Sequence, residues 1–201
     1  MKESLMKNLL KKSLLASAAI LFTVSVAQNV QAQTVTVNAT ADVSNELTLT
    51  VASPMNFGSF IAIGGPTPAT DTGTITIGTD GVLSAAAAGT DSNAAIIDDS
   101  AATAAEITIA DGAPGATINV LIDGVVDPTD GTDSLTLTDF VTSTNGGADQ
   151  SRTAGAGNEF TITYGASSPS TMIIGASLVT NATGAVGDGA YAGSFDVTYS
   201  Y

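Results

Sequence analysis

Apolar and polar residues alternate along most of this chain, and the alternation begins near residue 34. In TVTVNATADV (residues 34–43) every second residue is Val or Ala, and ELTLTV (residues 46–51) continues in the same phase. Strict alternation predicts a β-strand with one buried face. The later segments with this pattern are residues 72–78, 105–111, 116–123, 133–141, 158–165, 171–178 and 194–201.

Turn signals separate these segments. Asp80-Gly81, Asp123-Gly124 and Asn145-Gly146-Gly147 are pairs or triplets that favour tight turns. Short strands at this spacing, with no sustained helical period, predict an all-β domain built as a Greek-key sandwich or barrel. Residues 63–74 and 142–158 are expected to be surface loops, and the Ala-rich residues 84–89 and 100–106 to be short strand or loop.

The first 32 residues differ from the rest. A basic start is followed by an apolar run to Ala27 and small residues up to Ala32, as in a Sec-type signal peptide. The run is shorter than the ~20 residues that a membrane-spanning helix needs. We therefore expect a signal peptide over residues 1–32 and one exported domain over residues 33–201, located in the periplasm, on the cell surface or outside the cell, without membrane insertion.

The charge balance excludes several classes of partner. The chain has 5 Lys+Arg and 19 Asp+Glu, and the signal carries four of the cations and one of the acids. The remainder has Arg152 against 18 carboxylates, a formal charge of 1 − 18 = −17. Nucleic acid is not an expected partner, because its binding needs a Lys/Arg surface.

Residues that carry chemistry are scarce. The chain has no Cys, His or Trp, and no Lys after the signal, so the usual general bases, thiol nucleophiles and disulfides are absent from the sequence. Asp98 and Asp99 are adjacent, but neighbours on a strand point to opposite faces. We expect no enzymatic activity.

Calcium is the one cofactor that the composition leaves open. DPTDGTD places Asp127, Asp130 and Asp133 in one turn, and Ca²⁺ takes several oxygen ligands from loops. The spacing is not that of an EF-hand loop, and Asp-Gly pairs are common in hairpin turns. A structural turn is therefore the preferred interpretation, with calcium as the alternative.

The two ends of the exported domain are the most distinctive segments. The chain closes with GAYAGSFDVTYSY (residues 189–201), in which Phe195, Val197, Tyr199 and Tyr201 share one strand face. Gly189 and Gly193 flank Tyr191, and a Gly inside a strand fits a bulge or a close approach. These ends are either the first and last strands of one sandwich or surfaces that join separate subunits.

The sequence resembles the bacterial secreted family known as domain of unknown function 4402 (DUF4402). The resemblance is carried by TVTVNATADVSNELTLT after the signal, PMNFGSF at residues 54–60, GTITIGTDG at residues 73–81 and the C-terminal pattern Gly-x-Tyr-x-Gly-x-Phe-x-Val-x-Tyr-x-Tyr. More distantly, both ends are similar to those of spore-coat-U-type and chaperone-usher pilin domains, which have an immunoglobulin-like sandwich.

The pilin resemblance implies a function in assembly. A pilin sandwich lacks one strand, which a periplasmic chaperone supplies first and the next subunit's N-terminal segment replaces, in a fibre built with an usher. The donor residues here would be Val35, Val37, Ala39, Ala41 and Val43. The C-terminal strand beside the groove would contribute Tyr191, Phe195, Val197, Tyr199 and Tyr201. The alternative is a self-contained secreted sandwich that binds a glycan, calcium or another envelope protein.

Overall fold

A computed structural model describes residues 38–41, 46–165, 169–181 and 183–201. The chain divides into two units, Met1–Val43 and Ser44–Tyr201. In the first unit, residues 38–41 are exposed and belong to no strand. The predicted signal and most of the predicted strand over residues 34–43 lie outside the described residues.

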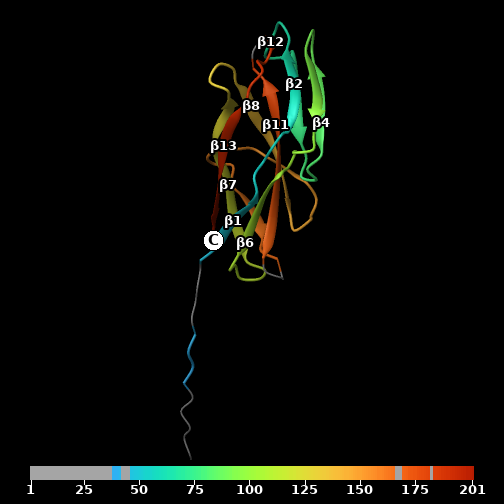
Figure 1. Cartoon of the computed structure of the whole chain (residues 1–201). Helices are drawn as coiled ribbons and strands as arrows, with labels where there is room; N and C mark the ends of the chain where they lie inside the picture. The colour runs from blue at the N-terminus through green and yellow to red at the C-terminus, as the bar shows by residue number, and fades with distance from the viewer. Residues whose placement is uncertain (1–37, 42–45, 166–168, 182) are drawn as a thin grey trace, which may run out of the picture. The chain divides into compact units, whose positions relative to one another are not determined.

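The second unit is built from antiparallel strands, and its described residues contain no helix (Figure 1). In chain order the strands are β1 (Thr48–Ser53), β2 (Ser59–Gly64), β3 (Thr72–Ile77), β4 (Leu83–Ala88), β5 (Asn93–Asp98), β6 (Ala105–Ala110), β7 (Thr117–Thr129), β8 (Leu135–Thr144), β9 (Gln150–Arg152), β10 (Phe160–Thr163), β11 (Ser170–Thr180), β12 (Gly184–Ala185) and β13 (Ala192–Ser200).

These strands form three sheets that pack as a sandwich. The largest is seven-stranded, with the order β1-β6-β11-β3-β4 and with β8 and β9 attached through β11. Two three-stranded sheets, β10-β7-β13 and β12-β2-β5, complete the fold. The all-β sandwich expected from the sequence is therefore confirmed, and the sheets do not close into a barrel.

The core follows from the alternation in the sequence. Along β6 and the first half of β7, up to Ile122, every second residue is buried and the intervening residues are more exposed. Buried side chains from both layers form the main core: Ile107, Ile109, Ile118, Val120, Ile122, Leu135, Leu137, Phe140, Ile162, Tyr164, Met172, Ile174 and Leu178. A second cluster of Ile75, Ile77 and Leu83 shares Met55, Phe57 and Phe60 with the first.

Two segments predicted as surface loops contain parts of strands. Residues 63–74 include the end of β2 and the start of β3, and residues 142–158 include the end of β8 and all of β9. The surface-loop prediction was wrong there, because pairing with β5 and β8 outweighs weak local strand propensity. The Ala-rich residues 84–89 lie mostly in β4, whereas residues 100–104 form a turn and an isolated bridge and Ala105 begins β6.

Replacing a core side chain should destabilise the fold much more than replacing an exposed one. Ile174 is fully buried, so Ile174→Ala should lower the free energy of unfolding by about 2–5 kcal/mol. Val82 is exposed, and Val82→Ala should change this free energy by less than about 0.5 kcal/mol. Chemical denaturation measures both values, and equal losses would contradict the assigned core.

Candidate functional site

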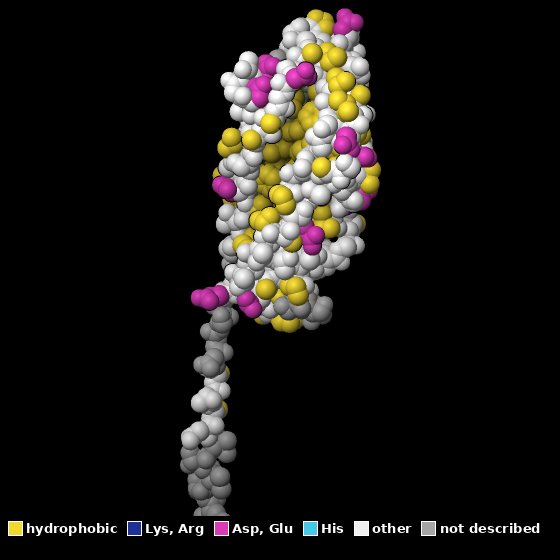
Figure 2. All heavy atoms as spheres, viewed as in Figure 1, with side chains coloured by type: hydrophobic (Ala, Val, Ile, Leu, Met, Phe, Trp, Pro, Cys, Tyr) yellow, Lys and Arg dark blue, Asp and Glu magenta, His cyan; other side chains and the backbone are white. Residues whose placement is uncertain are grey.

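A groove of about 900 Å³ opens into the sandwich beside the C-terminal strand. One side is formed by residues 55–62, which lead from β1 into β2, and the other by residues 185–195, which lead from β12 into β13. Figure 2 shows this hollow with hydrophobic side chains along its floor and few carboxylates inside. We call this cavity the groove.

The floor of the groove is the main core itself. Leu135, Leu137 and Leu178 line it, although each is buried from bulk solvent by the surrounding side chains. On the β13 side, the ring of Phe195 packs edge-on against the buried Phe140, with 5.1 Å between ring centroids. Phe60 borders the groove from β2. The floor of the groove therefore offers apolar side chains to any segment that enters it, whereas its rim is partly polar.

The strands beside the groove keep unpaired edges. β13 pairs with β7 along one edge, and within the described part of the chain no strand pairs with its other edge. β1, none of whose residues lines the groove, pairs only with β6 among the described strands. β2 pairs with β5 along one edge, but on the opposite edge β12 reaches only Ile63 and Gly64. Free backbone N–H and C=O groups thus lie on both sides of the opening.

Two residues of β1 face the core but remain exposed. Leu49 pairs with Ile109 and Val51 with Ile107, so each shares a sheet face with a buried core residue. Nevertheless, Leu49 is 42% exposed and Val51 is 67% exposed. The prediction that this strand buries one face identified the correct face, but its burial is incomplete because, among the described residues, no strand of the opposing layer covers β1.

The C-terminal strand contributes the facing wall. Val197 pairs with Ile122 and Tyr199 with Val120, both fully buried residues of β7. The Tyr199 hydroxyl lies 3.6 Å from the Met172 sulfur, and burial raises the pKa of this phenol. In contrast, Tyr201 is 48% exposed. Among the predicted groove residues, Tyr191 and Phe195 line the groove, whereas Val197, Tyr199 and Tyr201 are not among its lining residues.

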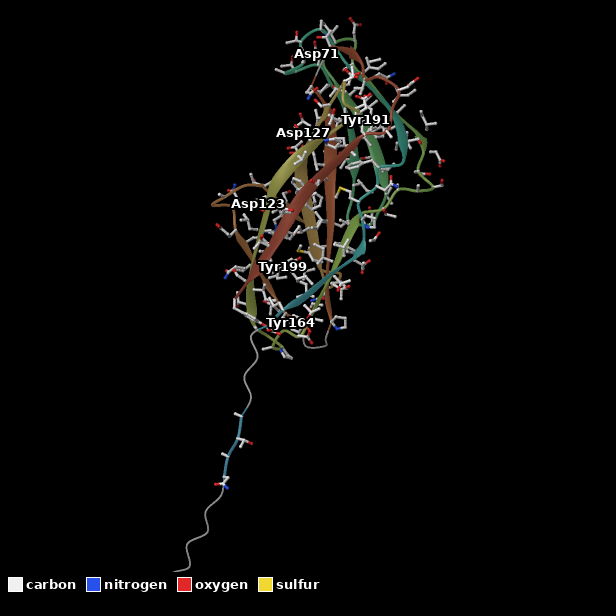
Figure 3. All side chains as sticks on the ribbon, turned by 60° about the vertical axis from the view of Figure 1, so that its left-hand side comes forward. Asp71, Asp123, Asp127, Tyr164, Tyr191 and Tyr199 are labelled. Carbon is white, nitrogen blue, oxygen red and sulfur yellow. The ribbon has the colours of Figure 1, made fainter. Side chains whose placement is uncertain are left out.

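Near Tyr191 the groove is closed by the segment that crosses from β12 to β13. The Val186 N–H donates to the Ala62 carbonyl at 3.1 Å, which ties this segment to β2. The Gly187 N–H donates to Asp133 Oδ2 at 2.9 Å, and the Tyr191 hydroxyl donates to the Gly187 carbonyl at 3.0 Å. We call residues 187–191 the crossover segment; Tyr191 is labelled in Figure 3.

Two glycines allow close approaches, of the crossover segment to the Asp130 side chain and of β13 to the backbone of β7. A Cβ on Gly189 would lie 2.9 Å from Asp130 Oδ2, and one on Gly193 would lie 2.5 Å from the Val126 carbonyl oxygen. The register of β13 against β7 shifts on both sides of Ser194, next to Gly193. The bulge and close approach expected at these glycines are therefore present.

The carboxylates of the three aspartates that the sequence offers as calcium ligands accept hydrogen bonds from backbone N–H groups. Asp127 Oδ1 accepts from the Leu137 N–H at 2.9 Å, and Asp130 Oδ1 accepts from the N–H groups of Thr132 and Asp133, each at 2.8 Å. Asp133 accepts from Gly187. Among the described residues, no group of three or more carboxylates is arranged to hold a metal ion. We call residues 127–133 the acidic turn; it binds the crossover segment through the hydrogen bond from the Gly187 N–H to Asp133.

The predicted donor residues lie mainly outside the described part of the chain. Val35, Val37 and Val43 belong there, while Ala39 and Ala41 are described and exposed. The sequence did not single out Phe60 as a groove residue, nor did it predict that Leu49 and Val51, which do not line the groove, would be exposed. The Asn-Phe-Gly motif was a signal for this region, since it lies where the chain passes from β1 to β2.

No helix within the described ranges is long and apolar enough to cross a membrane. Residues 47–201 match the family described as Domain of unknown function (DUF4402). No curated protein and no solved structure matches the chain.

Acid should loosen the crossover segment. The backbone N–H groups of Asp133 and Thr132 donate to Asp130 and lower the pKa of its carboxyl from 3.8. A carboxyl whose pKa is lower in the folded state than in the unfolded state stabilises the fold at pH values above the unfolded-state pKa. This stabilisation is lost as the pH falls through the folded-state pKa. The melting temperature should therefore decrease as the pH is lowered beyond about 4. Asp130→Asn, which keeps the acceptor oxygen but cannot be protonated in this range, should make the melting temperature less dependent on pH.

Asp188→Asn is the matched control for this measurement. It removes a carboxylate from the crossover segment without removing an acceptor of these backbone hydrogen bonds, so its melting temperature should follow pH as the unaltered chain's does. An Asp130→Asn variant with an unchanged pH profile would contradict the assignment.

Proposed function

This chain belongs to the DUF4402 family, and we propose that it is a non-catalytic, secreted structural subunit of a surface fibre, pilus or coat, assembled by N-terminal strand donation. In this proposal residues 34–43 of one subunit enter the groove of the next. The observation that carries it is the exposure of Leu49 and Val51 on the core-facing side of β1. A sandwich that leaves core-facing residues in water is short of one strand.

The dimensions of the donor segment suit the groove. Ten residues in extended conformation span about 33 Å, and the neighbouring β13 has nine residues. Val35, Val37, Ala39, Ala41 and Val43 would place small apolar side chains over the exposed faces of β1 and β13. The intervening Thr, Asn and Asp side chains would face solvent.

The unpaired edges give the donated strand its backbone partners. An extended segment that joins the free edge of β13 gains main-chain hydrogen bonds there, as in other strand-addition complexes. In the described part of the first unit, residues 38–41 belong to no strand, which leaves their backbone available for this pairing. The similarity to spore-coat-U-type and pilin domains is part of the same proposal.

A periplasmic chaperone and an usher are the proposed partners before assembly. An exposed apolar groove flanked by unpaired strand edges promotes aggregation, so a subunit in transit needs a temporary strand in this position. The formal charge of −17 outside the predicted signal adds mutual repulsion between free subunits and slows non-specific association.

Adjacent residues of β1 provide a sharp test of its exposed core-facing side. Val51→Asp places a charge on the core-facing side, where the donor would bury it, whereas Thr50→Asp places the same charge on the opposite face. Both residues are exposed, so both variants should fold with nearly unchanged melting temperature. Size exclusion and negative-stain microscopy of the exported full chain should show that Val51→Asp abolishes polymers and Thr50→Asp does not.

If Val51→Asp and the unaltered chain form the same polymers, the core-facing side of β1 is not part of the joint. A full chain that stays monomeric at high concentration, in the presence or absence of either substitution, would overturn the fibre proposal.

The donor segment can be tested in trans. A Val37→Asp chain should fail to polymerise, and a peptide of residues 33–45 should bind its empty groove and raise its melting temperature. At a peptide concentration 100 times the Kd, the expected stabilisation is about 2.7 kcal/mol. The same peptide with Val37→Asp should have no effect, while the Asn38→Asp peptide, altered on the opposite face, should act as the unaltered peptide does. Equal effects of these two peptides would argue against the proposed register.

A further inference from the structure

A second cavity lies between β9 and β10. It has a volume of about 260 Å³, and none of its lining residues lines the groove. β9 extends the seven-stranded sheet through β8, and β10 is the outer strand of the sheet that contains β7 and β13. Its polar lining comes mainly from Thr142, Thr144, Gln150, Arg152, Thr161 and Thr163. We call this cavity the Arg152 pocket.

The guanidinium of Arg152 is held in a fixed position in this pocket. Its Nε donates to the Thr142 hydroxyl at 2.9 Å, and Thr142 is itself almost completely buried. Its Cζ lies 3.9 Å from the centre of the Phe160 ring, which places the cation over the aromatic face. These two contacts orient the group but leave its two terminal nitrogens without a hydrogen bond among the described residues.

Arg152 is also the single cation outside the predicted signal, among 18 carboxylates. Nevertheless, in the part of the chain that the structure describes, no Asp or Glu forms an ion pair with it. An oriented guanidinium presents parallel N–H donors that match a carboxylate with two hydrogen bonds. The free donors therefore favour an external carboxylate as their partner.

The rest of the lining indicates what carries that carboxylate. Threonine hydroxyls donate and accept, and the Gln150 amide does both, so the walls can pair with several hydroxyl groups at once. Ile162 and Ala148 are the only apolar lining residues, which leaves little surface for an apolar peptide side chain. The volume is slightly below the ~300 Å³ at which ligand pockets usually begin, and it suits one sugar ring.

We propose that the Arg152 pocket binds a single carboxylate-bearing sugar unit of the uronic acid type. Arg152 binds the carboxylate, and the threonines and Gln150 bind the ring hydroxyls. Because the rest of the protein is strongly acidic, a longer polyanion is repelled outside the pocket, and recognition is restricted to one unit. The site is separate from the groove, so it does not depend on strand donation.

The test compares galacturonate with galactose, which differ in the carboxylate, by following amide chemical shifts of the full exported chain in NMR titrations. Galacturonate should shift the amides of the pocket residues. Galactose should bind at least about tenfold more weakly, as expected when a charge-assisted pair is removed.

Substitutions then assign the roles. Arg152→Gln should lose the preference for galacturonate, and Arg152→Lys, which keeps the charge but loses the paired donors, should retain only part of it. Thr163→Val should weaken both sugars, whereas Thr50→Val, an exposed threonine on β1, should weaken neither. If Arg152→Gln does not fold, the comparison of the two sugars on the unaltered chain still decides the proposal.

Three outcomes would overturn it. Equal binding of the two sugars would show that the carboxylate is not recognised. Chemical-shift changes confined to residues away from the pocket would show that the sugar binds elsewhere. Binding of a peptide that ends in the sequence DVTYSY, without binding of galacturonate, would assign the pocket to a chain terminus instead.

Discussion

A β-sandwich is stable only where each inner face is covered by the other layer, and this constraint governs the whole molecule. Over β6, β7, β8 and β11 the two layers overlap and the apolar residues are buried. Over β1 they do not, and Val51 is left facing water from the core side. The proposed joint between subunits rests on this interruption of the second layer, together with the groove and the free strand edges beside it.

With no disulfide to hold the fold, other contacts stabilise the margins of the groove. The edge-on contact between Phe140 and Phe195 ties the C-terminal strand to the core, and the acidic turn holds the crossover segment through backbone hydrogen bonds. The aspartates act as acceptors for N–H groups that no strand partner satisfies. A highly acidic sequence thus uses part of its charge locally, in building turns, while the remainder keeps the surface solvated.

The sequence predicted the elements whose patterns are local. Thr72–Ile77 and Ala105–Ala110 alternate regularly between Thr and Ile or similar residues, and both strands appear nearly as expected. Ser59–Gly64 was missed because Ala and Gly interrupt its pattern, and its pairing with β5 is a tertiary property. Alternation identified the core-facing side of β1, but whether another strand covers that side depends on the entire topology. The Arg152 pocket was likewise not predictable, because its two walls come from strands of different sheets.

The closed end of the groove has a mechanical consequence. Pairing of Val186 with Ala62 joins the two sides near the crossover segment, and the acidic turn anchors that segment from behind. In an assembly of the proposed kind, this closure acts as a fixed stop against which each incoming strand comes to rest. Every joint would then have the same length, and the spacing of subunits along the fibre would be set by the receiving subunit, independently of how the incoming strand was delivered.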